Sequence, residues 1–287
     1  MKMGCADNPN ISRLETYLDR RRRSSSRREW IFGFQTLKYP TQKKHPAAKM
    51  RVPVCWMLLC LFCLSSGTGL KSKIIRAADV YEGLWNKNLN VAKDILKLTF
   101  LQKMEKGKLS QDAFNNFMKQ DIYYVGQVTN MLKKLSETPG ELQDFFKNRY
   151  NSYDKFLHTL LHDYNLKDVS GIKPIPAIKK YIDDYREIME KEEPIYFAVG
   201  MYPCARLWPF IATELKMDKT NPFYKWKESN MCSHPEKHYK DLLNKYLQSE
   251  EEIERADKVF KQQILNEGEF FKASGQSGVE RRRRGVR

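Results

Sequence analysis

LQDFFKNRYNSYDKFLHTLLHDY, residues 142–164, carries large apolar or aromatic side chains at every third or fourth position. A helix has 3.6 residues per turn, so this spacing gathers these side chains into one stripe about six turns long. A second stretch with the same spacing is formed by Tyr239, Leu242, Leu243, Tyr246 and Leu247. No alternating run of β-branched residues is long enough for a strand, so we predict an all-α domain.

Helix-breaking residues divide this domain into segments. The breaks fall at Pro139-Gly140, at 171–176, at Glu193-Pro194 and at Asn221-Pro222. They leave room for about seven or eight helices. The chain contains no phosphate-binding loop, dinucleotide fingerprint or internal repeat. We therefore predict a single multi-helix bundle over residues 72–274.

The net charge of +16 in this 287-residue chain lies mostly outside the predicted bundle. Residues 1–70 hold 13 Lys and Arg against 4 Asp and Glu, and five Arg lie within 280–287. Between these ends, 33 basic residues face 30 acidic ones. A nucleic-acid-binding domain would be basic on its folded surface. We therefore expect no nucleic-acid partner for the bundle.

The two ends differ in composition from the bundle. Residues 1–49 form a basic, low-complexity extension, and 275–287 form an Arg-rich tail. Lys49-Met50-Arg51 precedes the apolar run VPVCWMLLCLFCL and then SSGTG. This order predicts a signal peptide at 50–69, because the run is shorter than the roughly 20 residues of a membrane span. We therefore expect no stable membrane span.

The leader predicts secretion or a lumenal location in the secretory pathway. Its position 50 residues into the chain indicates that translation starts at Met50. A signal anchor, a buried helix and an organelle transit segment are the alternatives, and a cytoplasmic location follows if the leader is a gene-model artefact. Of six cysteines, only Cys204 and Cys232 lie in the bundle. Two cysteines do not form a disulfide framework.

Two histidine pairs, His158 with His162 and His234 with His238, have i,i+4 spacing. Each pair could present both rings on one helical face. The first pair flanks an apolar stripe without a Glu-x-x-His motif, and Pro235 marks a helix start within the second. We interpret all four as surface or structural histidines rather than metal ligands.

Residues 120–124, Gln-Asp-Ile-Tyr-Tyr, place polar groups on an apolar helical face. Asp121 and Tyr124 are three residues apart, so both point to the same side. Burying them is costly unless each finds a partner. The spacing alone leaves open a binding pocket and a buried structural network.

Five motifs together resemble the TenA / thiaminase II family, and they occur in the family's order over residues 80–272. They are Phe100 to Tyr124 with Gly107, Leu109, Phe114, Phe117 and Gln120-Asp121 between; Tyr181; Tyr202-Pro203-Cys204; Asn221-Pro222-Phe223-Tyr224-Lys225-Trp226; and Glu267-Gly268-Glu269-Phe270-Phe271. The resemblance implies a haem-oxygenase-like helical fold and a homotetramer. It also implies no metal or organic cofactor.

The resemblance implies Cys204 as nucleophile and Glu267 as acid/base. Asp121, Tyr124, Tyr181 and Phe270 would bind a flat substrate, with Trp208 in the place of a pocket tyrosine. The implied reaction is hydrolytic deamination of an aminomethyl-aminopyrimidine, or cleavage of thiamin itself. A thiol is an effective nucleophile only as a thiolate or beside a base, which agrees with such a pair.

The sequence departs from the family pattern at two places. Asn230 stands where a tyrosine is usual, and Ala205-Arg206-Leu207-Trp208-Pro209 replaces the aromatic residues after Cys204. Arg206 would favour an anionic substrate and depress the pKa of Cys204 if it pointed inward, and would do neither if it pointed outward. Pro209 is expected to disturb the helix.

These departures leave two other functions open. The same pocket could belong to a non-catalytic binder of thiamin-like or other aromatic ligands. On a related helical fold, some of the four histidines could serve a metal-dependent oxidase.

Overall fold

The computed structural model describes residues 79–284, with side chains described for residues 79–275. Local sequence explains where several helices begin. Asp79 and Ser110 precede two helices and accept hydrogen bonds from the amides of Glu82 and Ala113, each at 3.2 Å. Such caps satisfy backbone donors that have no partner inside a helix. Pro176 and Pro194 lie in the first turns of two others, where their missing N–H costs nothing.

The described residues contain nine helices and no strand, which confirms the predicted all-α class. In chain order they are α2 (Val80–Leu96), α3 (Thr99–Glu105), α4 (Gln111–Glu137), α5 (Gln143–Asp163), α6 (Pro176–Lys191), α7 (Pro194–Glu214), α8 (Tyr224–Met231), α9 (Glu236–Tyr246) and α10 (Glu250–Arg284). Every predicted break lies at a boundary between two of these helices, with Pro176 and Pro194 opening α6 and α7. The count exceeds our prediction because α3 and α8 span only 7 and 8 residues.

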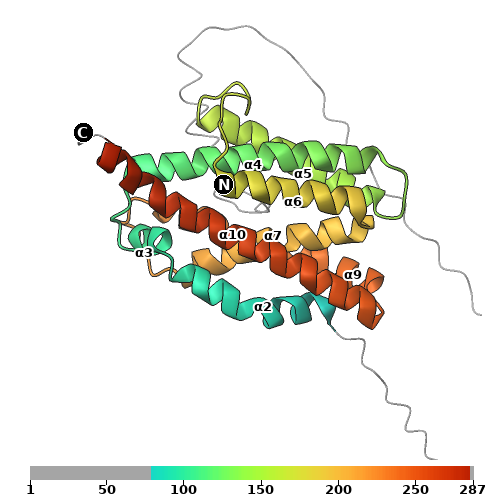
Figure 1. Ribbon diagram of the computed structural model, residues 1–287. Coiled ribbons are helices and arrows are strands. Elements are labelled where there is room, and N and C mark those ends of the chain that lie inside the picture. The colour runs from blue at the N-terminus through green and yellow to red at the C-terminus, as the bar shows by residue number, and fades with distance from the viewer. Residues whose placement is uncertain (1–78, 285–287) are drawn as a thin grey trace, which may run out of the picture. The chain divides into compact units, whose positions relative to one another are not determined.

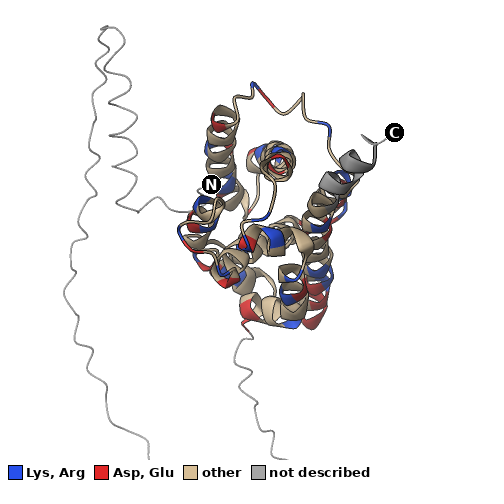
Figure 2. Ribbon diagram, turned by 90° about the vertical axis from the view of Figure 1, so that its left-hand side faces the viewer, with Lys and Arg blue, Asp and Glu red and all other residues tan. Residues whose placement is uncertain are grey.

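The long helix α10 organises the bundle. It crosses the molecule diagonally and packs against α2, α3, α4, α6 and α7 (Figure 1). The helices α4 and α5 form an antiparallel pair beside α6. Basic and acidic residues are interleaved along the outer helices (Figure 2), in keeping with the balanced charge of this part of the sequence. The helices α2, α6, α8, α9 and α10 all pack against α7.

The helix α7 is the most deeply buried of the bundle and contains two interior prolines, Pro203 and Pro209. Each proline removes one backbone donor, and an interior proline costs an isolated helix about 3 kcal/mol. The prediction that Pro209 disturbs the helix was nevertheless wrong, because α7 continues to Glu214. Burial against α6, α8 and α10 holds the helix in place through both prolines. It is this helix that carries Cys204.

Several predictions concern residues outside the described part of the chain. The extension at 1–49 and the predicted signal peptide at 50–69 both lie there, so the leader and the location it implies stay predictions. At the other end, α10 runs to Arg284, and the boundary predicted after residue 274 falls inside this helix. Within the described residues, no helix is both long enough and apolar enough to cross a membrane.

Candidate active site

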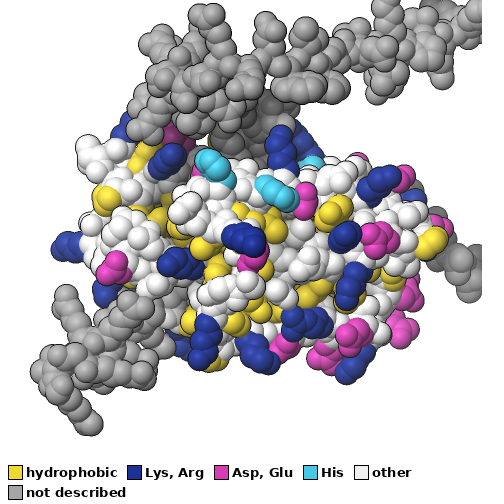
Figure 3. Space-filling model, turned by 90° about the horizontal axis from the view of Figure 1, so that it is seen from above, with side chains coloured by type: hydrophobic (Ala, Val, Ile, Leu, Met, Phe, Trp, Pro, Cys, Tyr) yellow, Lys and Arg dark blue, Asp and Glu magenta, His cyan; other side chains and the backbone are white. Residues whose placement is uncertain are grey.

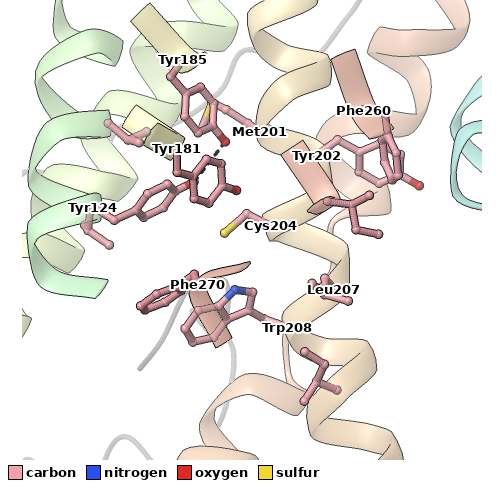
Figure 4. Close-up of a cluster of buried hydrophobic side chains, with 14 of the residues drawn as sticks. Tyr124, Tyr181, Tyr185, Met201, Tyr202, Cys204, Leu207, Trp208, Phe260 and Phe270 are labelled. Carbon is pink, nitrogen blue, oxygen red and sulfur yellow. Dashed lines mark hydrogen bonds between the residues drawn. The ribbon is translucent and has the colours of Figure 1, made fainter. Parts of the chain in front are cut away.

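Four helices bring the seven predicted site residues to one buried place. They are Asp121 and Tyr124 on α4, Tyr181 on α6, Cys204 and Trp208 on α7, and Glu267 and Phe270 on α10. None is more than 8% exposed. The thiol of Cys204 points into the space between the phenols of Tyr124 and Tyr181 and the rings of Phe270 and Trp208 (Figure 4). The catalytic and binding roles of these residues stay predictions.

The carboxyl group of Glu267 is held by two donors from different helices. The Tyr181 hydroxyl donates to Oε1 at 2.9 Å, and the Trp208 indole N–H donates to Oε2 at 3.2 Å. Burial raises the pKa of Glu267 to about 7, while these two hydrogen bonds and one with Cys204 oppose the rise. A carboxyl group that titrates near neutrality can both accept and return a proton.

Cys204 lies close enough to Glu267 and to the Tyr124 hydroxyl for both groups to influence its pKa. Burial, followed by the negative charges of Glu267 and Asp121, raises the pKa of the Cys204 thiol well above its usual value. The resting side chain is therefore a neutral thiol. It becomes a useful nucleophile only when an adjacent base takes its proton, and Glu267 is within reach to do so.

Asp121 supplies a second carboxyl group to the same site. Burial, with a smaller contribution from the charge of Glu267, raises its pKa to about 8. The described residues provide no hydrogen-bond partner for this carboxyl group. At neutral pH Asp121 is therefore mainly protonated, and it can donate one hydrogen bond and accept another.

A cluster of phenols lines the side of the site opposite Trp208. The rings of Tyr124 and Tyr181 have centroids 4.9 Å apart, and Tyr185 stacks on Tyr181 at 5.3 Å. Tyr185 was not among the predicted site residues, although it lies one turn after Tyr181 on the same helical face. Tyr153 on α5 belongs to the apolar stripe identified in the sequence. Burial raises the pKa of Tyr153 most, and the charge of the nearby Cys204 raises it further.

The opposite wall is an aromatic stack. Phe117 stacks on Phe270 with a centroid distance of 4.9 Å and on Trp208 at 5.8 Å. Trp208 thus lies beside the thiol, and its role in binding a substrate stays a prediction. Large flat side chains therefore lie on two sides of the thiol.

Arg206 points away from the thiol, which decides between the two orientations considered above. Its guanidinium donates to Tyr202 Oη at 2.6 Å and to Glu82 Oε2 at 2.8 Å. It also lies 4.8 Å from the ring centroids of both Tyr81 and Trp85. Arg206 therefore joins α7 to α2 and gives the site no positive charge.

The remaining sequence signals have structural surroundings. Asn230 donates from Nδ2 to the Trp226 carbonyl at 2.8 Å. The four bundle histidines are exposed, and Figure 3 shows histidine side chains on the molecular surface. Within the described residues, no group of three or more His, Cys, Asp or Glu side chains is placed to hold a metal ion.

The sequence matches the model of the TENA/THI-4/PQQC family over residues 90–276. It is 22% identical over 200 residues to a protein of Staphylococcus aureus named aminopyrimidine aminohydrolase. That match covers 63% of this chain and 87% of the relative.

Solved structures share this arrangement of helices. A TenA homologue from P. horikoshii OT3 superposes with a TM-score of 0.58 at 18% identity, covering 69% of this chain and 98% of that one. A structure from Silicibacter sp. TM1040, named a TenA family transcription regulator, has a TM-score of 0.60 at 11% identity and covers 68% of this chain and 96% of its own. At these identities the likeness establishes the fold.

Proposed function

Because this chain belongs to the TENA/THI-4/PQQC family, we propose that it is a thiaminase II-like hydrolase of aminopyrimidines that uses a cysteine nucleophile. One observation carries the proposal. The Cys204 thiol lies within reach of the Glu267 carboxyl group in a buried site that also holds Asp121. A nucleophile beside a base that titrates near neutrality is the arrangement that covalent hydrolysis requires.

The substrate class follows from the groups that line the site. An aminopyrimidine is planar and presents a ring nitrogen acceptor beside an amino donor. A protonated Asp121 carboxyl group complements that edge, because it donates through O–H and accepts through its carbonyl oxygen. The aromatic wall of Trp208 and Phe270 would cover one ring face, and Tyr124 and Tyr181 would contact the other side.

The reaction begins when Glu267 removes the thiol proton and the Cys204 sulfur adds to an electron-poor carbon of the pyrimidine ring. The new C–S bond pushes electrons toward the exocyclic carbon, which expels its amine. Glu267 returns the proton to that leaving group. In thiamin, the electrons would instead expel the thiazole as a neutral molecule, and Glu267 would release its proton to solvent before the water step.

Water completes the reaction. Glu267 takes a proton from water as the oxygen attacks the exocyclic carbon, and the ring electrons then expel the Cys204 thiolate. The protonated Glu267 reprotonates the sulfur and restores the starting state. The overall change is the addition of one water, which yields a hydroxymethyl pyrimidine and the released amine.

A turnover assay on the full chain tests the proposal. The purified protein is incubated with thiamin and with aminomethyl-aminopyrimidine, and pyrimidine release is measured by chromatography. We expect hydrolysis of at least one of the two. Tight binding by calorimetry without turnover across a pyrimidine panel would instead favour a non-catalytic binder, and failure to bind would reject both.

A further inference from the structure

Tyr185 has a place in the site that no sequence motif indicated. We propose that Tyr185 is a positioning residue. It accepts a hydrogen bond from the Tyr124 hydroxyl and thereby prevents Tyr124 from donating a hydrogen bond to the Cys204 sulfur. Glu267 is then the group left to remove the thiol proton. The proposal deepens the function proposed above and rests on it for its catalytic meaning, although its test does not require turnover.

The geometry fixes the direction of the hydrogen bonds. The Tyr185 hydroxyl donates to the Gly200 carbonyl at 2.9 Å, and a carbonyl can only accept. The hydroxyls of Tyr124 and Tyr185 are 3.0 Å apart. Since the one proton of Tyr185 goes to Gly200, Tyr124 must be the donor in this second bond.

The proton of Tyr124 is therefore used within the phenol cluster. The Tyr181 hydroxyl donates to Glu267, so its proton is not available to Tyr124. The Cys204 thiol points into the space beside the Tyr124 and Tyr181 phenols (Figure 4). In this arrangement the thiol can donate to Tyr124, whereas a thiolate would receive no hydrogen bond from it.

The position of Tyr185 is fixed on several sides. Its ring stacks on Tyr181 at 5.3 Å and lies 5.4 Å from the Phe197 centroid, and the residue is fully buried. Its acceptor Gly200 lies one helical turn before Cys204 on α7. Tyr185 thus links the orientation of Tyr124 to the helix that carries the nucleophile.

Other titratable groups also act on the sulfur. They come from every helix packed around it: Asp121 and Tyr124 on α4, Tyr153 on α5, Tyr181 and Tyr185 on α6, Tyr239 on α9 and Glu267 on α10. The two carboxyl groups oppose ionisation of the thiol. Among these groups, Tyr124 is the one that both lies beside the thiol in Figure 4 and is hydrogen-bonded to Tyr185.

The test measures the ionisation of Cys204 directly. The full chain is treated with iodoacetamide across a pH series, and alkylation is quantified by mass spectrometry on the tryptic peptide 192–206, which contains Cys204 and no other cysteine. In Tyr185→Phe, Tyr124 is free to donate to the thiolate. A hydrogen bond to a charged group lowers the pH midpoint by about one to two units.

A double-mutant cycle separates this effect from general damage to the core. In a Tyr124→Phe background, Tyr185→Phe should produce no further shift. Tyr202→Phe removes an equally buried phenol hydroxyl that bonds instead to the Tyr81 carbonyl, and it should leave the midpoint unchanged. An unchanged midpoint in Tyr185→Phe, or an equal drop without the Tyr124 hydroxyl, would overturn the proposal.

A second variant decides the question even if Tyr185→Phe does not fold. Tyr124→Phe alone should leave the midpoint unchanged or lower it, because the thiol loses only an acceptor. A rise would mean that Tyr124 already donates to the thiolate, and the proposal would be wrong. Since alkylation does not depend on hydrolysis, a failure of the proposed function would be seen separately in the turnover assay.

Discussion

Replacing Trp208 with phenylalanine removes the indole N–H that donates to Glu267 Oε2 at 3.2 Å. The change keeps an aromatic ring against Phe117 and leaves the bond from Tyr181 in place. That lost hydrogen bond favours the ionised carboxylate, so its removal raises the pKa of Glu267 above its present value of about 7.

The size of the effect follows from the geometry. A hydrogen bond to a charged group contributes about 1.5–3 kcal/mol. At 3.2 Å this one is at the long end of the range, so we take the lower figure, which corresponds to about one pKa unit. The pKa of Glu267 then moves to about 8. At pH 7 the ionised fraction falls from roughly one half to roughly one tenth.

The assay is the pH dependence of kcat/KM for pyrimidine release, which reports the ionisation of the free protein. Trp208→Phe should be about five-fold slower than the parent at pH 7 and recover above about pH 9. The matched control is Trp226→Phe, because the Trp226 ring lies 5.8 Å from Trp208 and its buried N–H has no partner in the described part of the chain. The reasoning is refuted if the Trp208→Phe midpoint stays at its parent value, or if Trp226→Phe moves it equally.

Three further predictions use other assays. Asp121→Asn should raise the melting temperature above pH 8, and the gain should shrink toward pH 5. The reason is that the pKa of Asp121 is raised to about 8, so the stabilising contribution of this carboxyl group is present at low pH and lost as pH rises through that value. A gain in melting temperature that stays constant with pH would contradict this. Arg206→Gln should lower the free energy of unfolding by about 1–3 kcal/mol, measured with denaturant, and leave the alkylation midpoint of Cys204 unchanged, because Arg206 contacts Glu82 and Tyr81 instead. Thiamin phosphates should be hydrolysed at least about ten-fold more slowly than thiamin. Two carboxyl groups line the site, and no Lys or Arg of the described chain shifts the pKa of either. Equal rates for the two substrates would contradict this prediction.

The sequence was sufficient for features that depend on local chemistry. The helix breaks at Pro139-Gly140 and Asn221-Pro222 follow from backbone restrictions that act within a few residues, and the structure confirms them. The effect of Pro209 depends instead on burial against other helices, and the local rule gave the wrong answer there.

Identifying the residues of the site required both the family resemblance and the structure. From spacing alone, Asp121 and Tyr124 could belong either to a binding pocket or to a buried structural network, because the residues that surround them are distant in the sequence. Tyr181 and Glu267, for example, are 86 residues apart and meet only through the crossing of α6 and α10. The orientation of Arg206 likewise depends on α2, which no local pattern near Cys204 indicates.

Tyr185 is a residue of the site that no sequence pattern indicated. Its one-turn spacing from Tyr181 is equally compatible with an ordinary buried core position. Its hydrogen bond with the Tyr124 hydroxyl, combined with its own bond to the Gly200 carbonyl, marks it as part of the site, and both bonds follow from the fold rather than from the residue type.

The most direct test of the central claim is pyrimidine release by Cys204→Ser. The substitution replaces one atom in a buried site, so the variant should fold and bind the pyrimidine, which circular dichroism and calorimetry can verify. A hydroxyl beside Glu267 is a far weaker nucleophile than a thiol, and we expect kcat to fall by about three orders of magnitude or more. Turnover within about ten-fold of the parent would contradict a mechanism that depends on the Cys204 sulfur.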